Sequence, residues 1–330
     1  MLFWKILNLV FFSIVLIKSA EWVVVSLRRI AKRSKVGVFI VSAIILAVGT
    51  SLPELFISLT SAINENPNIS LGVVIGSNIA NIALISGFVA LFVGKINVHG
   101  EYLKRDVVIA LVSGLLPLGL MADGILGRVD GLILLLVYIS YVASFFKDKF
   151  AEITNEYNQK SFFYGDSFAY KFLREITHID FDITKEYGKL FLSLALMLFS
   201  SQVIIRNAES LAVIVGIPVF VVGLIILAVG TSLPELVFSI KSVKEGEPKM
   251  FFGNLLGSTI ANSTLIVGIT AVISPIHIAS FDDYRNAIIA FVIVFVTFWA
   301  FIRTKHRLDR YEGLVLIIMY LIFVILEFVI

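Results

Sequence analysis

Twelve consecutive residues of this chain occur twice without a single change. The stretch from Ile44 to Leu55 reads IILAVGTSLPEL, and the stretch from Ile225 to Leu236 repeats it 181 positions later. The correspondence continues downstream at the same offset, where GSNIAN at 76–81 is matched by GSTIAN at 257–262. So long an identity in one register indicates an internal duplication, which predicts two equivalent structural units.

Both copies lie in strongly hydrophobic sequence. Of the 330 residues, 58% are hydrophobic and only 15% are charged, and the apolar runs approach the ~20 residues that cross a bilayer. The absence of cysteine excludes disulfides and thiolate metal sites. The sequence shows no catalytic triad, phosphate-binding loop, zinc-binding helix motif or nucleic-acid-binding surface. We therefore expect a membrane protein that is not an enzyme, with no cofactor, no nucleic-acid partner and no obligate protein partner.

The hydrophobic pattern predicts an all-α polytopic fold with ten transmembrane helices. The first segment is too long for a signal peptide and is interpreted as a span. The repeated motifs place proline, glutamate and asparagine inside the second, third, seventh and eighth segments, where they are costly, so we expect those four helices to be broken at mid-membrane. The predicted spans are 4–27, 36–64, 68–93, 103–122, 126–147, 187–208, 217–243, 250–274, 284–302 and 311–329.

Basic residues are concentrated in alternate loops. The loops around 28–35, 94–105, 147–189, 241–249 and 303–310 hold 22 of the 27 Lys and Arg residues. Because cytoplasmic loops carry the excess of Lys and Arg, this side is predicted to be cytoplasmic and both termini extracellular. The expected location is the cell membrane, with the lipid bilayer as surroundings.

The two copies begin five spans apart, so the second is predicted to enter the membrane inverted relative to the first. Inverted repeats related by an axis in the membrane plane are typical of secondary transporters. The expected first half is 1–146, with its repeat at about 40–90, and the second half is 190–330, with its repeat at about 221–272. Between them, 147–189 is interpreted as a cytoplasmic connector lying on the membrane surface, or alternatively as a regulatory ion or partner site.

Each copy of the repeat combines a helix break with a carboxylate. Pro53 cannot donate a hydrogen bond to the carbonyl four residues earlier, and its ring opens that turn, so carbonyls between Ala47 and Thr50 should lose helical partners. In lipid such groups need a replacement, which a cation or water in a cavity can supply. Glu54 lies four residues after Thr50 and three after Ser51, so their side chains share a helix face.

The same residues have a structural alternative. Ser51-x-x-Glu54 fits a capping box that would start the second half of a broken helix, with Pro53 in its first turn. Capping and ion binding are compatible with each other. The occurrence of two matched copies in apolar surroundings favours ion binding.

The downstream part of each copy adds further oxygen atoms. Ser77 and Asn81 are four residues apart and share a face, although the serines could instead satisfy their own helix backbone and the asparagines could join helices. The set contains two carboxylates, amides, hydroxyls and freed carbonyls, which suits Ca²⁺ and Na⁺ and suits zinc or copper poorly. The second copy supplies the equivalent residues Thr231, Ser232, Glu235, Ser258 and Asn262.

Other small and charged residues in the spans have simpler explanations. Lys18 and Glu21, three residues apart, are expected to form a local ion pair facing the bundle. Glycines in the repeats are expected to let helices approach closely, and these are Gly72, Gly76, Gly253 and Gly257.

At these motifs the sequence resembles the calcium/cation antiporter superfamily, and within it the prokaryotic sodium–calcium exchangers. The resemblance is carried by GTSLPEL at 49–55 and 230–236, GSNIAN at 76–81 and GSTIAN at 257–262, which look like the paired alpha repeats of that family. With the flanking spans it covers nearly the whole chain except 147–189. It implies two inverted halves of five spans and four ion sites clustered at mid-membrane.

The resemblance also implies roles for individual residues. The repeat glutamates, here Glu54 and Glu235, would bind Ca²⁺. They would be assisted by backbone carbonyls at the helix breaks, here those of Ala47, Thr50, Ala228 and Thr231. The serine and asparagine side chains would mainly serve Na⁺, and these are Ser51, Ser77, Asn81, Ser232, Ser258 and Asn262.

Asn262 departs from part of the family, because some members carry an acid at that position. Its amide removes a charge and argues against the potassium co-transport that has been linked to that acid. The leading hypothesis is a Na⁺/Ca²⁺ antiporter that exports Ca²⁺ by alternating access. A cation/H⁺ antiporter on the same scaffold is the alternative, although proton-coupled relatives usually carry a different repeat motif. A passive cation channel is a third hypothesis, disfavoured because the ligands lie in broken helices rather than in a ring of carboxylates.

Overall fold

The protein is described here by a computed structural model covering residues 2–33, 50–97, 102–157, 181–244, 248–278, 282–305 and 307–329. Nearly all of these residues are helical. Within them, seven helices or helix runs are long and apolar enough to cross a membrane. The chain is therefore a multi-pass helical membrane protein. Ala47 and the first half of the predicted second span, residues 36–49, lie outside the described residues.

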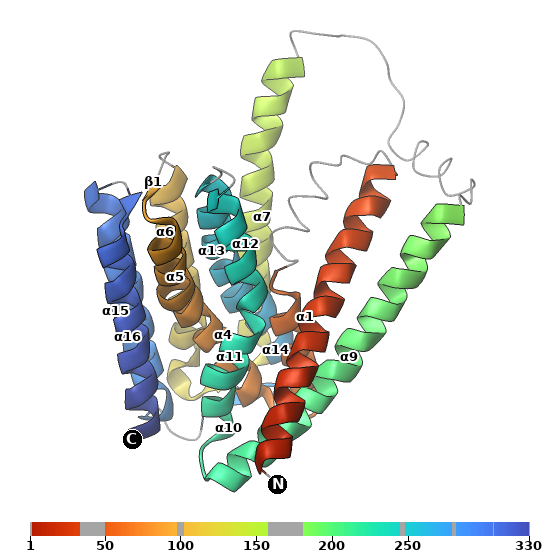
Figure 1. The fold of residues 1–330 in the computed structure, drawn as a ribbon, viewed down its shortest axis with the longest axis vertical. Coiled ribbons are helices and arrows are strands. Elements are labelled where there is room, and N and C mark those ends of the chain that lie inside the picture. Colours follow the sequence, from red (N-terminus) through yellow and green to blue (C-terminus); the bar gives the residue numbers. More distant parts are fainter. Residues whose placement is uncertain are drawn as a thin grey trace.

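Six long helices run without interruption in the described part of the chain. Two of them, α1 and α9, lie side by side and lean away from the remaining helices (Figure 1). Buried leucines and isoleucines such as Leu16, Ile204 and Ile205 belong to the apolar cluster between them. The six are α1 (Leu2–Arg33), α6 (Tyr102–Leu120), α7 (Arg128–Tyr157), α9 (Phe181–Val215), α15 (Asp282–Lys305) and α16 (Arg310–Val329).

The helix run from Pro67 to Val93 lies at the centre of the molecule. It consists of α4 (Pro67–Ile79), the π-helical segment η1 (Ala80–Ile85) and α5 (Ser86–Val93). In the most apolar stretch of this run, 89% of the residues are buried inside the protein, compared with 33% for the corresponding stretch of α1. Glycine permits this central position, because a Cβ on Gly72 would lie 2.3 Å from the Phe220 carbonyl oxygen, and one on Gly76 1.9 Å from that of Leu224. The predicted packing role of these two glycines is thus confirmed.

The equivalent run in the second copy consists of α13 (Pro248–Ile260), the π-helical η4 (Ala261–Ile266) and α14 (Val267–Ile273). The prediction that these third and eighth spans are broken was wrong. Both continue through the motif as helix, and each inserts one π-helical segment that begins at the alanine before Asn81 or Asn262. A π segment widens the helix without opening its backbone, and such segments are frequent at functional sites.

The seventh span is broken as predicted. It comprises α10 (Val219–Val221), the π-helical η3 (Val222–Leu227), α11 (Ala228–Thr231) and α12 (Leu233–Lys244), with Ser232 at the turn between the last two. In the first copy the described residues begin with the equivalent turn at Thr50 and Ser51, which leads into α3 (Leu52–Ile63). Here proline lies near the start of the new helix, where its missing N–H would have no helical acceptor.

Two short antiparallel strand pairs join the halves of the chain, and each pair takes one strand from each half. Strand β1 (Ile96–Asn97) pairs with β4 (Arg307–Leu308), and β2 (Ile125–Leu126) pairs with β3 (Ile276–His277). In each pair the segment after the central run of one half meets the segment before the last helix of the other half. The buried partners correspond as well, since Ile96 faces Leu308 and Ile276 faces Leu126, all with no exposed surface.

Two helix crossings show the same exchange. Helix α5 packs on α16, and α14 packs on α7. At the first crossing a Cβ on Gly87 would lie 2.6 Å from the Gly313 carbonyl oxygen, and at the second a Cβ on Gly131 would lie 2.8 Å from that of Gly268. The backbones touch because no side chain separates them.

Both ends of the chain, marked N and C in Figure 1, lie at the lower end of the molecule. Strand β1 and the C-terminal end of α7 lie at the upper end. This arrangement agrees with the alternation predicted from the basic loops, in which both termini share one side.

Both ends of the predicted connector 147–189 are helical, since α7 runs to Tyr157 and α9 begins at Phe181. The prediction for Lys18 and Glu21 needs correction. Lys18 and Glu21 do form an ion pair, 2.8 Å between Nζ and Oε2, but on an exposed face of α1 rather than toward the bundle. A pair on this outer face allows the long side chains to extend along the helix surface.

Candidate cation-binding site

The turn at Thr50 and Ser51 and the helix break at Ser232 each precede a buried glutamate, Glu54 or Glu235. Each glutamate lies in the first turn of the helix that follows the break, α3 or α12. Glu54 has no exposed surface and Glu235 only 1%. The two lie in one buried region, since Ser77 contacts both Glu54 and Ser232, three residues before Glu235. A buried pair of carboxylates is costly unless other groups or cations compensate the charge.

The capping alternative for Ser51 is not supported. Ser51 occupies the N-cap position of α3, but its side chain makes no capping hydrogen bond. Its Oγ is buried and has no hydrogen-bond partner. The hydroxyl is therefore available as a ligand in a site that it shares with Glu54.

Ser77 joins the two copies of the repeat. Its Oγ donates to Glu54 Oε1 at 3.1 Å and lies 3.1 Å from Ser232 Oγ and 3.4 Å from Thr231 Oγ1. The carbonyl oxygen of Ala228 is 3.5 Å away. One serine on the central helix α4 thus contacts the glutamate of its own copy and the broken turn of the other. These five residues were all predicted from the sequence.

The other half of the site repeats one of these contacts. Thr50 Oγ1 lies 3.4 Å from Ser258 Oγ, which is the equivalent of the Thr231–Ser77 contact and has the same length. Thr50 also donates to Asn254 Oδ1 at 3.0 Å. Asn254 was not predicted. The signal for it was present, because Asn254 lies four residues before Ser258 and shares its helix face.

In the part of the chain that the structure describes, several oxygen atoms in this region are buried without a hydrogen-bond partner. They include one oxygen of Glu54, both oxygens of Glu235 and the amide oxygens of Asn81 and Asn262. Buried polar atoms almost always have a partner, so a cluster of orphaned acceptors indicates a missing donor or cation. Carboxylate, amide and hydroxyl oxygens form the hard ligand set that Ca²⁺ and Na⁺ prefer. Among the described residues no group of three or more His, Cys, Asp or Glu side chains gathers, which leaves these neutral oxygens to complete any shell.

The carbonyl of Ala228 differs from the prediction. The break was expected to free it, but it accepts the backbone N–H of Ser232 at 3.1 Å and the hydroxyl of Thr231 at 3.2 Å. The helix ends one turn later than expected, so this carbonyl keeps its helical partner. It still borders the site through its 3.5 Å contact with Ser77. Its counterpart Ala47 lies outside the described residues.

Each repeat glutamate is followed, one helical turn later, by a buried serine. Ser58 lies four residues after Glu54, and Ser239 lies four residues after Glu235. Both serines are 1% exposed, and neither hydroxyl has a hydrogen-bond partner. The sequence carried this signal too, because the spacing from the glutamate is identical in both copies.

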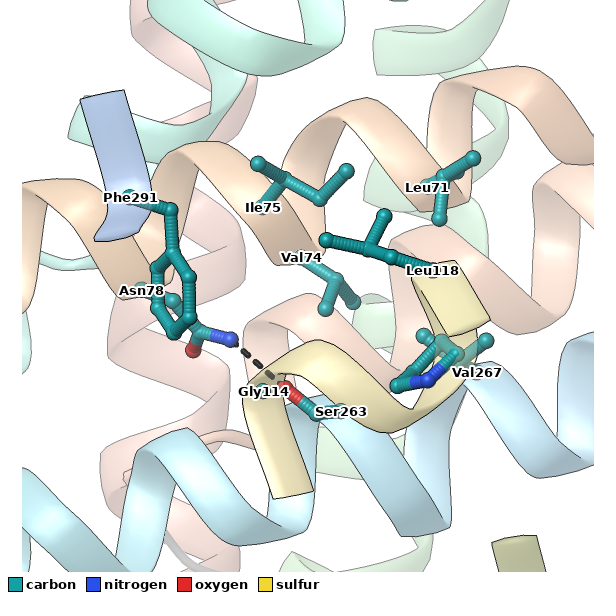
Figure 2. Close-up of a pocket in the computed structure, with 10 residues that line it drawn as sticks. Leu71, Val74, Ile75, Asn78, Gly114, Leu118, Ser263, Val267 and Phe291 are labelled. Carbon is teal, nitrogen blue, oxygen red and sulfur yellow. Dashed lines mark hydrogen bonds between the residues drawn. The ribbon is translucent and has the colours of Figure 1, made fainter. Parts of the chain in front are cut away.

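Asn78 lies beside the site and was also missed. Its Nδ2 donates to Ser263 Oγ at 2.8 Å, as Figure 2 shows, and its Oδ1 accepts from Asn262 Nδ2 at 3.2 Å. The adjoining cavity is small, about 10 Å³, and mostly apolar. Its lining includes Leu71, Val74, Ile75, Leu118, Val267 and Phe291.

Comparison with known proteins identifies the family. The sequence pattern of the sodium/calcium exchanger protein family matches residues 4–147 and 186–329, which is most of the chain. The chain belongs to the sodium/calcium exchanger family. The match leaves out the middle of the connector and includes both copies of the repeat.

Two relatives match this chain over most of its length, and a third matches part of it. Inner membrane protein YrbG of Escherichia coli is 29% identical over 87% of this chain and 86% of its own length. Sodium/calcium exchanger MaX1 of Methanosarcina acetivorans is 28% identical over 98% of this chain and 97% of its own length. Sodium/potassium/calcium exchanger 2 of Mus musculus is 32% identical, but over only 37% of this chain and 18% of its own length.

A solved structure shows the same fold. The sodium-calcium exchanger NCX_Mj superimposes with a TM-score of 0.61 and 24% sequence identity, and the match covers 98% of both chains. Relatives whose names state an activity are exchangers or antiporters rather than enzymes. Together with the family match, these findings support a cation/Ca²⁺ antiporter.

Proposed function

We propose that this family member exchanges Na⁺ for Ca²⁺ across the cell membrane and exports Ca²⁺. The observation that carries the proposal is the cluster of buried, unpaired oxygens contributed by both copies of the repeat around Glu54 and Glu235. One Ca²⁺ would neutralise the two carboxylates, and Na⁺ ions could replace it. The similarity to a named sodium/calcium exchanger of Methanosarcina acetivorans supports sodium as the counter-ion.

The proposed site draws equally on the two copies. Glu54 and Glu235 would bind Ca²⁺. Backbone carbonyls would lie at the edge of the calcium site, and these are the carbonyls of Ala47, Thr50, Ala228 and Thr231. The remaining side chains would complete the shells of Na⁺. These are Ser51, Ser77, Asn81, Ser232, Ser258 and Asn262. Contacts across the copies, between Ser77 and Ser232 at 3.1 Å and between Ser258 and Thr50 at 3.4 Å, support this assignment for three of the serines.

The proposed architecture is ten spans in two inverted halves, 1–146 and 190–330, joined by a cytoplasmic connector. The two strand pairs and the two glycine crossings support it. In each case a contact from the first half to the second has a counterpart made by the equivalent segments from the second half to the first. Both termini would be extracellular, as the basic loops favour. Alternating access would move the halves about the central site.

The decisive experiment is calcium flux in proteoliposomes with one gradient imposed at a time. A sodium gradient alone should drive Ca²⁺ against its own gradient. A proton gradient that drives it instead would establish the cation/H⁺ alternative. A potassium arm is included because part of the chain resembles a sodium/potassium/calcium exchanger. Calcium flux that needs no counter-gradient would indicate a channel and would contradict the proposal.

Topology can be tested separately. A tag at either terminus should be reachable only from outside intact cells, and a tag inserted at Asn158 only from the cytoplasm. Termini on opposite sides would require an odd number of spans. The inverted architecture would then be wrong, whatever ion is transported.

A further inference from the structure

Asn78 connects the central helix of the first half to the π-helical segment of the second. It is 2% exposed and lies on α4, three residues before Asn81. Both of its hydrogen-bond partners, Asn262 and Ser263, lie in η4. Figure 2 shows one link of this short chain, the hydrogen bond from Asn78 to Ser263 at the wall of the cavity.

The chain of hydrogen bonds fixes the orientation of the Asn262 amide. An asparagine presents an oxygen on one side and an NH₂ group on the other. Because Asn262 Nδ2 donates to Asn78 Oδ1, the oxygen of Asn262 is the atom left buried and unpaired. The reverse orientation would expose two N–H donors, which repel a cation.

Asn78 itself is poorly placed to bind an ion. Both ends of its amide are already occupied, and the adjoining cavity of about 10 Å³ is lined mainly by apolar side chains. A water or ion in such a space needs two to four polar partners. The geometry therefore assigns to Asn78 a role through Asn262 rather than a contact with the transported ion.

Among the described residues, no side chain orients the amide of Asn81 in the way that Asn78 orients that of Asn262. Thr259 occupies the position that corresponds to Asn78, and its hydroxyl donates to the Leu255 carbonyl of its own helix at 3.0 Å. Both amide atoms of Asn81 are buried without a partner. The difference follows from the position at which the repeated motifs GSNIAN and GSTIAN differ, since the asparagines that end both motifs match.

We propose that Asn78 is a positioning residue that holds the Asn262 amide with its oxygen toward the transported cations, and so makes the Asn262 side the better organised Na⁺ site. This inference rests on the proposed function. Groups that orient a metal ligand typically change affinity by roughly 10- to 100-fold when they are removed. Ser263 accepts a hydrogen bond from Asn78 and so helps to orient it. Removing the Ser263 hydroxyl should therefore weaken Na⁺ binding in the same way, but by less.

The test is a double-mutant cycle on the sodium dependence of calcium uptake in proteoliposomes. Asn78→Ala should weaken the apparent sodium affinity by roughly 10-fold and leave the calcium half-saturation within about twofold. Ser263→Ala should shift sodium affinity in the same direction by less. Thr259→Ala is the matched control at the equivalent position and should change neither. Asn78→Ala combined with Asn262→Ala should behave like Asn262→Ala alone, because Asn78 acts through that amide.

Two outcomes would overturn the inference. Additive effects of Asn78→Ala and Asn262→Ala would mean that the residues act independently. Equal losses for sodium and calcium would mean that Asn78 only supports packing. If the unmodified protein shows no sodium-driven flux, the proposed function fails, and the same cycle is then read from thermal stabilisation of the detergent-solubilised protein by NaCl and CaCl₂. In that assay a selective, non-additive loss of stabilisation by sodium supports the inference, and its absence rejects it.

Discussion

The two copies of the repeat share twelve identical residues, yet their carboxylates have different surroundings. Glu54 accepts a hydrogen bond from Ser77, whereas neither oxygen of Glu235 has a hydrogen-bond partner. The threonines also differ in their contacts, because Val73 and Asn254 occupy equivalent positions outside the identical stretch and Asn254 accepts a hydrogen bond from Thr50 of the opposite copy. Identical motifs supply the same ligands, and the less similar helices around them decide how each ligand is held.

The largest effect should come from neutralising either carboxylate. Glu54→Gln and Glu235→Gln should each reduce calcium transport by roughly a hundredfold, because a divalent ion then meets only one opposing charge in a buried site. Calcium flux in proteoliposomes provides the measurement. Near-normal flux in one variant would show that the two copies are unequal in the calcium site itself. Both variants should fold, since an amide is less costly to bury than a carboxylate.

The glycine crossings test whether the halves are equally close-packed. A Cβ on Gly87 would lie 2.6 Å from a backbone oxygen, whereas one on Gly268 would lie 3.0 Å from the equivalent oxygen. Gly87→Ala should therefore lower the free energy of unfolding by about 2 kcal/mol and Gly268→Ala by about 1 kcal/mol. Thermal unfolding in detergent measures the difference. Gly119→Ala is the control, because no described atom lies within 4 Å of its Cβ position.

The serine pair should separate the copies by a smaller amount. Ser77 Oγ contacts Glu54 and the broken turn of the second copy, while the one side-chain contact found for Ser258 among the described residues is with Thr50. Ser77→Ala should weaken apparent sodium affinity by roughly 10-fold and Ser258→Ala by roughly 3-fold. The sodium dependence of calcium uptake is the readout. Equal shifts would mean that these side-chain hydrogen bonds do not decide how strongly each serine binds Na⁺.

The smallest difference between the copies is expected one turn beyond the glutamates. The hydroxyls of Ser58 and Ser239 are buried and unpaired, so Ser58→Ala and Ser239→Ala should each raise stability by about 1 kcal/mol in sodium- and calcium-free detergent. Ser242→Ala is the control, since that hydroxyl already donates to the Phe238 carbonyl. Destabilisation by either alanine would show that the hydroxyl has a partner such as ordered water.

Much of the site could be predicted because its determinants are local. A proline and a glutamate inside a hydrophobic span predict a helix break with a buried carboxylate, and Ser232 lies at such a break. The spacing of four between Ser77 and Asn81 places both on one helix face, and both are fully buried. Duplication then supplies the second set of ligands from the first.

The parts that were missed depend on contacts between distant segments. Asn254 and Asn78 matter because of which residues lie opposite them, Thr50 and Asn262, more than 180 positions away. The π segments at Ala80 and Ala261 depend on how the central helices pack, and no residue type specifies them. The prediction for the Ala228 carbonyl was wrong because it placed the end of the helix about one turn too early. Helix boundaries are hard to predict from sequence, and this carbonyl still accepts the backbone N–H of Ser232.

The exchanged strands also constrain how the protein can be made. Strand β1 leaves the ribosome about 200 residues before β4, the strand that completes its hydrogen bonds. At ordinary rates of synthesis that interval is roughly 10 to 40 s. During this time the first half is already in the membrane with an unpaired strand and an uncovered glycine surface on α5. Separately expressed halves should therefore be short-lived alone and should rescue each other when synthesised together.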